Sequence, residues 1–488
     1  MLYTNNHVQL LRDNFDNVKK DLEKIKNNIL SPNMEERKVI HNIIINYCSE
    51  QKRKIYGGYA WHLLIQNKNP NDGLYSTDKI PDIDIYSPEP LTDWFNLCNL
   101  LFDAGFENVQ GEEALHPETY TIKINRILFC DITYVPKNIY ARMPFQSIKG
   151  LNCIDPKFIA IDYFRILSDP ISSLFRFFDC SEELKTFTRY VKLQSYYNFP
   201  YNDRPYIVEK ILPDKQLVLN DVYEFIKNKT SIVVIGFYAY NYFRSSSGFN
   251  YVPIPYFEFI SIDYKKDVLE LLDLLNKHNV NHKEFYPFFQ FTDYSTEIYL
   301  GESLVCRIFG NNKKSVPYLE LPARNFYTNK ESKKFIRFGS WAISLLYLLI
   351  GAYKAYVAQN KTLQQSIYHL ISHCLIARDT FLTTIKKTIL DDTIFSEYVY
   401  NCIGDTITVE KERMILIEKR KKNKEPAIYR YEPKDGKKDP PKFLGFKNTS
   451  GNQIVNTKYL QLVEHVDTTD SESVVSKDDI SIHEGSGI

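Results

Sequence analysis

Three aspartates are spaced so that they can act together. Asp82 and Asp84 stand two residues apart in the alternating stretch KIPDIDIYSPEP, so a β-strand here would project both carboxylates from one face. Asp131 lies in the later stretch TYTIKINRILFCDITYVP, which predicts two more alternating strands. Converging carboxylates repel one another unless cations neutralise them, and such oxygen ligands suit Mg²⁺ or Mn²⁺. The pattern therefore predicts a site for two divalent cations, which can hold the attacking and leaving oxygens of a phosphoryl transfer.

Two glycines precede these aspartates and suggest where a phosphate group would bind. Gly57 and Gly58 stand between a short β-like stretch, RKIY, and the predicted helix start YAWHLLI. Unhindered backbone N–H groups and the positive end of a helix dipole suit a triphosphate. We therefore expect the glycine turn to face the phosphates of a nucleotide.

The elements around these residues predict a mixed α/β chain. Apolar residues at three- and four-residue spacing predict helices over residues 8 to 50, interrupted at SPN, and an amphipathic helix over residues 91 to 103. Strands are expected at the glycine turn and at both aspartate stretches. The longest uncharged run, residues 338 to 353, has only 16 residues, fewer than the ~20 that span a bilayer. We interpret it as a buried core helix.

An internal repeat divides the chain into two similar units. Four short segments recur in the same order at offsets of 174 to 179 residues: 55–61 as 234–240, 81–87 as 255–261, 128–132 as 304–308, and 157–159 as 334–336. The sequence therefore predicts one α/β unit present twice, joined by the proline-rich connector NFPYNDRPY.

Comparison of the two copies distinguishes residues that serve the fold from residues that serve a function. The three carboxylate positions become Tyr256, Glu258 and Arg307 in the second copy, whereas the apolar strand positions and the turn glycine persist. We therefore expect the aspartates to be functional and the second unit to have lost the activity. Lys157 recurs as Lys334, so we expect Lys157 to serve the fold.

Charge is balanced overall but segregated near the C-terminus. The chain has 488 residues and a net charge of +1, which excludes a polycation that binds nucleic acid by charge alone. Residues 411 to 447 contain thirteen Lys and Arg against six Asp and Glu, and residues 464 to 488 contain one against seven. We expect the basic segment, with Tyr429, Tyr431, Phe443 and Phe446, either to contact RNA or to be a solvated linker. We expect the acidic tail to be disordered.

Other chemistry has little support in the sequence. The eight cysteines form no C-x-x-C pair, and no secretory signal opens the chain, so a reducing compartment is expected. Two H-x-x-x-H pairs, His278/His282 and His369/His373, would each share a helix face, but neither has the glutamate of a hydrolytic zinc site between its histidines. We interpret them as surface or core histidines.

The glycine turn, the Asp-x-Asp strand and the third aspartate together resemble the nucleotidyltransferase superfamily of the DNA polymerase β type. The stretches KIYGGYAWHLLI, IPDIDIYSPEP, LFCDITYVPKNIY, FIAIDYFRILSDP and LKTFTRYVKLQSYYNFP resemble the poly(A) polymerase catalytic subunits of large cytoplasmic DNA viruses of the poxvirus, asfarvirus and mimivirus types. One departure is a gap of 23 residues between Gly58 and Asp82, whose loop NKNPNDGLYSTD has no evident role.

The resemblance implies an activity and a site. It implies template-independent polyadenylation of mRNA, in which an RNA 3′-hydroxyl attacks the α-phosphorus of ATP and pyrophosphate leaves. Asp82 and Asp84 would ligate both metal ions, Mg²⁺ or Mn²⁺, and Asp131 the catalytic one, while Gly57 and Gly58 face the β- and γ-phosphates. The implied location is the host cytoplasm, in a viral factory, with possible packaging in the virion. A homodimer or a processivity subunit is a further implied partner, and no membrane association is expected.

We accordingly expect an α/β (α+β) fold with two tandem nucleotidyltransferase-like units, the second degenerate. The expected divisions are N-terminal helices at 1–45, a catalytic domain at 46–200, a linker at 201–225, a degenerate domain at 226–390, a basic region at 391–463 and an acidic tail at 464–488. Two alternatives remain open. One is a different RNA nucleotidyltransferase, CCA-adding or oligoadenylate-forming, and the other is a non-catalytic RNA-binding scaffold.

Overall fold

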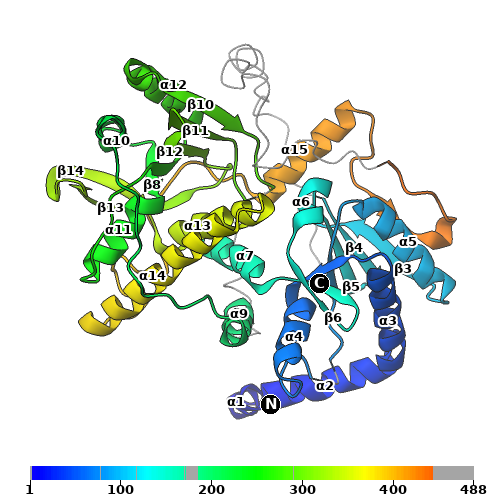
Figure 1. Ribbon diagram of the computed structural model, residues 1–488. Helices are drawn as coiled ribbons and strands as arrows, with labels where there is room; N and C mark the ends of the chain where they lie inside the picture. The colour runs from blue at the N-terminus through cyan, green and yellow to red at the C-terminus, as the bar shows by residue number, and fades with distance from the viewer. Residues whose placement is uncertain are drawn as a thin grey trace.

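Two eight-stranded mixed sheets, each covered by helices, form the body of the molecule (Figure 1). The structure is a computed structural model that describes residues 3–76, 79–116, 118–169, 171, 185–289 and 291–442. The strand orders are β16-β3-β4-β5-β2-β1-β7-β6 and β10-β11-β12-β9-β8-β14-β13-β15. The predicted fold class, a mixed α/β chain with tandem units, is confirmed.

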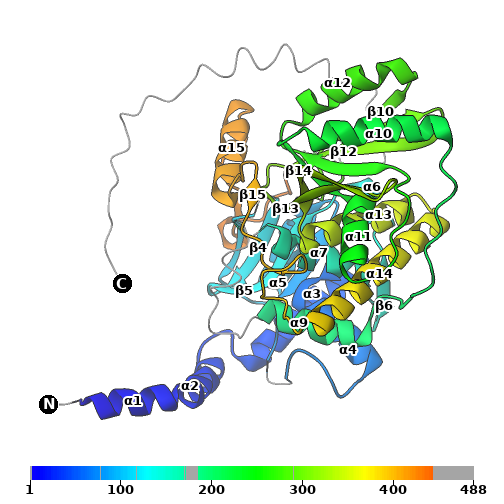
Figure 2. The ribbon, with the colours of Figure 1, turned by 90° about the vertical axis from the view of Figure 1, so that its left-hand side faces the viewer.

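The N-terminal helices differ in how they meet the body. They are α1 (Asn5–Asp13), α2 (Phe15–Ile29) and α3 (Met34–Glu50). The first two extend away from the body (Figure 2), and their described side chains are exposed. In contrast, α3 buries Ile40 and Ile44 against the first unit. We therefore propose that the first unit begins with α3 rather than at residue 46.

The first sheet places a glycine turn and two parallel strands side by side. Strand β1 pairs antiparallel with β2 and parallel with β7, and β2 pairs parallel with β5. The elements of this unit are β1 (Lys54–Tyr56), α4 (Gly57–Lys68), β2 (Ile83–Ser87), α5 (Pro90–Asp103), β3 (Val109–Glu113), β4 (Thr119–Ile124), β5 (Ile127–Tyr134), α6 (Lys137–Arg142), β6 (Phe145–Ile148), β7 (Leu151–Ile154), α7 (Pro156–Ser168) and α9 (Lys185–Tyr196).

The second sheet repeats this connectivity. Strand β8 pairs antiparallel with β9 and parallel with β14, and β9 pairs parallel with β12. The elements are α10 (Pro213–Lys227), β8 (Ile232–Ile235), α11 (Gly236–Ser246), β9 (Phe257–Ser261), α12 (Tyr264–Leu275), η2 (Asn276–His278), β10 (Asn281–Phe285), β11 (Ser295–Leu300), β12 (Ser303–Gly310), β13 (Val316–Asn325), β14 (Lys330–Gly339), α13 (Trp341–Val357) and α14 (Lys361–Ile385).

Three of the four repeated segments occupy equivalent elements, but the fourth does not. Lys157 lies in the first turn of helix α7, whereas Lys334 lies within strand β14. The predicted equivalence of the two lysines is therefore wrong. The structural counterpart of α7 is α13, because each helix follows the strand that pairs parallel with the first strand of its unit. A three-residue match is too short to show whether its period is that of a helix or a strand.

The chain returns to the first sheet near its C-terminus. Strand β15 (Cys402–Ile403) pairs with β13, helix α15 (Val409–Lys422) follows, and β16 (Arg430–Tyr431) pairs with β3; the last described element is η3 (Pro433–Asp435). The predicted acidic tail, Phe443 and Phe446 lie outside the described residues.

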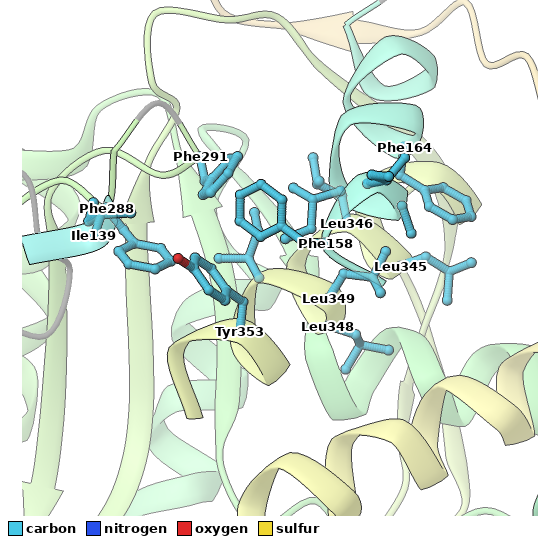
Figure 3. Close-up of a cluster of buried hydrophobic side chains, with 14 of the residues drawn as sticks. Ile139, Phe158, Phe164, Phe288, Phe291, Leu345, Leu346, Leu348, Leu349 and Tyr353 are labelled. Atoms are coloured by element: carbon cyan, nitrogen blue, oxygen red, sulfur yellow. The ribbon is translucent and has the colours of Figure 1, made fainter. Parts of the chain in front are cut away.

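The two units share one continuous apolar core. Helices α7 and α13 pack against each other between the sheets, and Figure 3 shows their side chains meeting those of neighbouring loops. The Phe158 ring lies edge-on to Tyr353 at 4.8 Å and to Phe291 at 5.5 Å between ring centroids. The predicted core helix over residues 338 to 353 is confirmed, since α13 is buried along most of its length. Among the described residues, no helix is long and apolar enough to cross a membrane.

Candidate active site

Asp84 and Asp131 lie directly opposite each other on adjacent parallel strands. Strand β2 pairs with β5 so that the Cα atoms of these two residues are partners. The flanking Ile83 and Ile85 are buried, which turns the intervening Asp84 to the other face of the sheet. Asp82 immediately precedes β2 and is exposed. The sheet therefore places Asp84 and Asp131 side by side, with Asp82 immediately before the strand that carries Asp84.

Asp131 is in an environment that disfavours its negative charge. Burial, followed by the charge of Asp82, raises the pKa of Asp131 to about 6, and Lys123 opposes this only weakly. Its buried Oδ1 atom has no hydrogen-bond partner among the described residues. A buried carboxylate oxygen without a donor is costly unless a cation meets it. The donor set therefore fits a divalent cation.

The carboxylates are not already arranged as a closed metal cage. Among the described residues, no group of three or more His, Cys, Asp or Glu side chains converges closely enough to hold a metal ion. Ions such as Mg²⁺ keep several waters and are bound through few carboxylates together with substrate phosphates. An open arrangement of carboxylates on one sheet face agrees with that mode of binding.

Gly57 is required because the backbone of the turn passes directly over Asp84. Tyr56 pairs with Asp84 across β1 and β2, and Gly57 follows with φ +66°. A Cβ atom at Gly57 would lie 1.8 Å from Asp84 Oδ2. Any side chain would therefore displace the carboxylate, and the left-handed backbone would add strain. The sequence suggested phosphate binding for this glycine, and the structure adds that it makes room for Asp84.

The second unit keeps this geometry and replaces the carboxylate cluster with an ion-pair network. Gly236 has φ +62°, and a Cβ there would lie 2.3 Å from Glu258 Oε2. Glu258 pairs in register with Arg307, as Asp84 does with Asp131. Arg307 donates from Nη1 to Glu258 Oε1 and from Nε to Glu297 Oε1, each at 2.7 Å. A guanidinium thus neutralises the carboxylates of this unit.

Each unit also contains an aspartate that accepts a hydrogen bond from a nearby serine, and the sequence analysis did not single out either of them. The Ser87 hydroxyl donates to Asp93 at the start of α5, and the Ser261 hydroxyl donates to Asp267 at 2.6 Å at the start of α12. The shared offset of 174 residues and the common Ser-x₅-Asp spacing were the available signals. Because an aspartate with a structural role survives in the second unit, the loss of the other three points to function.

The histidine pairs have ordinary structural partners. His278 Nε2 lies 2.7 Å from Asp221 Oδ2. The expectation of a shared helix face is wrong for His278 and His282, which lie in η2 and β10. His369 and His373 do share α14, and the Nε2 atom of each lies 2.8 Å from the Arg204 carbonyl oxygen.

Part of the basic segment is structural. The Arg420 guanidinium donates to both oxygens of buried Glu113, at 2.6 and 2.9 Å. The Tyr431 ring stacks on Phe95 at 3.9 Å and is 4% exposed. The expectation that Tyr431 contacts RNA is therefore wrong, because the ring belongs to the core under β3. Exposed lysines remain on the last turn of α15 and just after it.

Two copies of one α/β unit, with a glycine turn and three carboxylates in the first, define a nucleotidyltransferase-like protein. Residues 42–173 match the family model described as "Poly(A) polymerase catalytic subunit". Residues 192–464 match "APMV, Putative poly(A) polymerase, catalytic subunit, C-terminal". The chain belongs to the poly(A) polymerase catalytic subunit family.

Individual relatives agree with this assignment. A putative poly(A) polymerase catalytic subunit of Acanthamoeba polyphaga mimivirus is 30% identical over 94% of this chain and 84% of its own length. One from African swine fever virus is 27% identical over 43% of this chain and 41% of its own. The crystal structure of the Megavirus polyadenylate synthase matches with a TM-score of 0.81 and 28% identity, over 94% of this chain and 93% of that one. This chain is accordingly an enzyme of polyadenylation, with viral relatives.

Proposed function

We propose that the first unit transfers AMP from ATP to the 3′-hydroxyl of RNA, without a template and with release of pyrophosphate. The observation that carries this proposal is the pairing of Asp84 with Asp131, whose buried oxygen has no donor among the described residues. Two carboxylates would not be kept side by side in this way without a cation to neutralise them. ATP, RNA and a divalent cation are what the family implies.

Each residue of the site has a proposed role. Asp82, Asp84 and Asp131 would hold two ions, Mg²⁺ or Mn²⁺. Such ions supply charge neutralisation at the α-phosphate and acidify the attacking hydroxyl. Gly57 and Gly58 would present the N-terminus of α4 to the β- and γ-phosphates, where backbone N–H groups and the helix dipole favour negative charge.

The second unit would act as a non-catalytic partner. Arg307 pairs with Glu258 and Glu297, so these two carboxylates are neutralised by a side chain of the same unit. We propose that the second unit supports the first unit, with which it shares one continuous apolar core. We also propose a location in the host cytoplasm, in keeping with the viral relatives, and leave a homodimer or a processivity subunit to be tested by sedimentation.

Primer extension with each nucleoside triphosphate supplied singly tests the proposed reaction. We expect the full-length chain to extend an RNA primer with ATP in the presence of Mg²⁺ or Mn²⁺ and to stop when the ions are chelated. Asp82→Ala, Asp84→Ala and Asp131→Ala should each abolish extension. A matched control is Glu112→Gln, which removes a partly exposed carboxylate paired with Lys123 on the same sheet.

The outcomes separate the alternatives. Extension at the wild-type rate by Asp82→Ala and Asp84→Ala would overturn the site. Addition of CTP followed by ATP would indicate a CCA-adding enzyme. A chain that binds the primer but incorporates none of the four nucleotides would be an RNA-binding scaffold.

A further inference from the structure

The unassigned loop between Gly58 and Asp82 is attached to helix α9. Lys192 donates to the Gly73 carbonyl at 2.7 Å and pairs with Asp72. Tyr196 donates from its hydroxyl to Asp72 Oδ2 at 2.8 Å. From the other side, the backbone N–H of Leu74 donates to His62 Nδ1 at 3.0 Å. The loop is thus held between α4 and α9.

This attachment brings two side chains to the glycine turn. A Cβ atom at Gly58 would lie 2.1 Å from Tyr75 Oη and 2.9 Å from Arg189 Nη1. The Arg189 guanidinium in turn lies over the Tyr75 ring, 5.1 Å from its centroid. The tyrosine ring therefore fixes where the guanidinium sits, through a cation–π contact.

Positive charge gathers at this turn. Gly57 and Gly58 open α4, whose N-terminus is the positive end of the helix dipole. Among the described residues, Arg189 forms no ion pair with a carboxylate. A helix N-terminus with a guanidinium beside it favours the binding of phosphate oxygens.

The second unit has a bulky residue at the position equivalent to Gly58. The position of Gly58 is occupied by Phe237, whose side chain is buried at the start of α11. An aromatic ring on the helix N-terminus excludes a phosphate group. The second glycine of the turn, with Arg189 beside it, is therefore a feature of the first unit and not a requirement of the shared fold.

We propose that Arg189 binds the β- and γ-phosphates of ATP at the Gly57–Gly58 turn, and that Tyr75 and the loop at residues 69–76 position its guanidinium. This inference rests on the proposed function, because it assigns a ligand to the same site. The planar guanidinium can donate two parallel hydrogen bonds to phosphate oxygens. The loop thereby gains a role: it carries Tyr75 to the turn.

Calorimetric titration of the full-length chain with MgATP and with AMP, in the absence of RNA, tests the proposal. Arg189→Ala removes charged hydrogen bonds to the outer phosphates, so we expect about a 10- to 100-fold weaker Kd for MgATP. The affinity for AMP, which lacks those phosphates, should be unchanged. Arg189→Lys should fall between, since it keeps the charge and loses the fork. Tyr75→Ala removes the ring on which the guanidinium lies, so it should also weaken MgATP binding.

Two controls accompany these titrations: a variant at a distant lysine and a measurement of folding for each variant. Lys38→Ala removes one exposed positive charge from α3 and should leave both affinities unchanged. Melting temperatures confirm that each variant is folded. Wild-type MgATP affinity in Arg189→Ala, or an equal loss for MgATP and AMP, would overturn the role of Arg189 and leave the proposed function intact. A wild-type chain that binds no MgATP would instead overturn the proposed function itself.

Discussion

Arg307 donates a hydrogen bond of 2.7 Å to Glu258 at the pair of strand positions where, in the first unit, Asp131 lies opposite Asp84. One unit therefore carries its neutralising cation as a side chain, and the other has a buried carboxylate oxygen with no donor among the described residues. Burial alone would raise the pKa of Glu297, but the charge of Arg307 lowers it below its usual value. The strand carboxylates are thus neutralised by an arginine in the second unit, whereas we propose that bound cations neutralise them in the first.

Replacing Arg307 should destabilise the second unit. Arg307→Ala leaves the partly buried Glu258 and Glu297 without their cation, and breaking a fully buried pair typically costs about 3–5 kcal/mol. We expect a clear drop in melting temperature, with primer extension retained at temperatures where the chain is folded.

The matched control for this prediction removes the whole network. Arg307→Met combined with Glu258→Gln and Glu297→Gln leaves no buried charge at these three positions, so most of the lost stability should return. Equal melting temperatures for the wild type and Arg307→Ala would show that the network contributes nothing.

The two turn glycines form a pair of variants that separates stability from activity. Gly57→Ala and Gly236→Ala each place a Cβ against a carboxylate at positive φ, so each should cost about 1–3 kcal/mol. Only Gly57→Ala displaces a carboxylate of the candidate site, and a displacement of about 1 Å can reduce the rate by about 10²-fold. Comparing melting temperature with extension rate for both variants checks this, and a similar loss of rate in both would contradict the assignment.

In the absence of divalent cations, Asp131 should make the stability of the folded chain depend on pH. Its folded-state pKa of about 6 lies above the usual 3.8, so the folded chain binds the proton more readily than the unfolded chain between these values. Stability should therefore fall as pH rises from about 4 to about 6, by up to about 3 kcal/mol, and stay low above that range.

Asp131→Asn isolates this contribution. The variant should melt at a higher temperature than wild type at pH 7 without divalent cations, and the difference should disappear near pH 4. Added Mn²⁺ should stabilise the wild type more than the variant. If the melting temperatures of the wild type and Asp131→Asn changed with pH in the same way, burial of Asp131 would not be destabilising the folded chain.

The exposed lysines at the end of α15 should contribute to RNA binding by charge. Lys421, Lys422 and Lys424 are exposed, whereas Arg420 is buried against Glu113. Replacing the three lysines with glutamine should reduce the slope of log affinity against log salt by about 0.7 for each phosphate of single-stranded RNA that a lysine neutralised. Arg420→Ala should instead lower the melting temperature, because it leaves Glu113 buried without its partner. An unchanged salt slope in the triple variant would place the RNA elsewhere.

Much of the fold and the candidate site was readable from the sequence because local periods carry the information. Alternation around Ile83 and Ile85 predicted a strand and the face of its aspartates, and the repeat predicted two units. The Lys157 and Lys334 match failed because three residues do not distinguish a helix from a strand. The retained Asp93 and Asp267 escaped notice because their importance lies in a hydrogen bond to a serine six residues earlier.

The sequence by itself determined which residues can do chemistry and that one of two similar units has lost it. Only the tertiary structure decided how these residues meet. Strand register placed Asp131 opposite Asp84, and the return of β16 to β3 buried Tyr431, which the basic composition around it had suggested for RNA. The attachment of the loop to α9 placed Tyr75 beside Arg189 at Gly58. The reason is physical: side-chain type and period are local properties, whereas register, burial and the neutralisation of a charge depend on residues that are far apart in the chain.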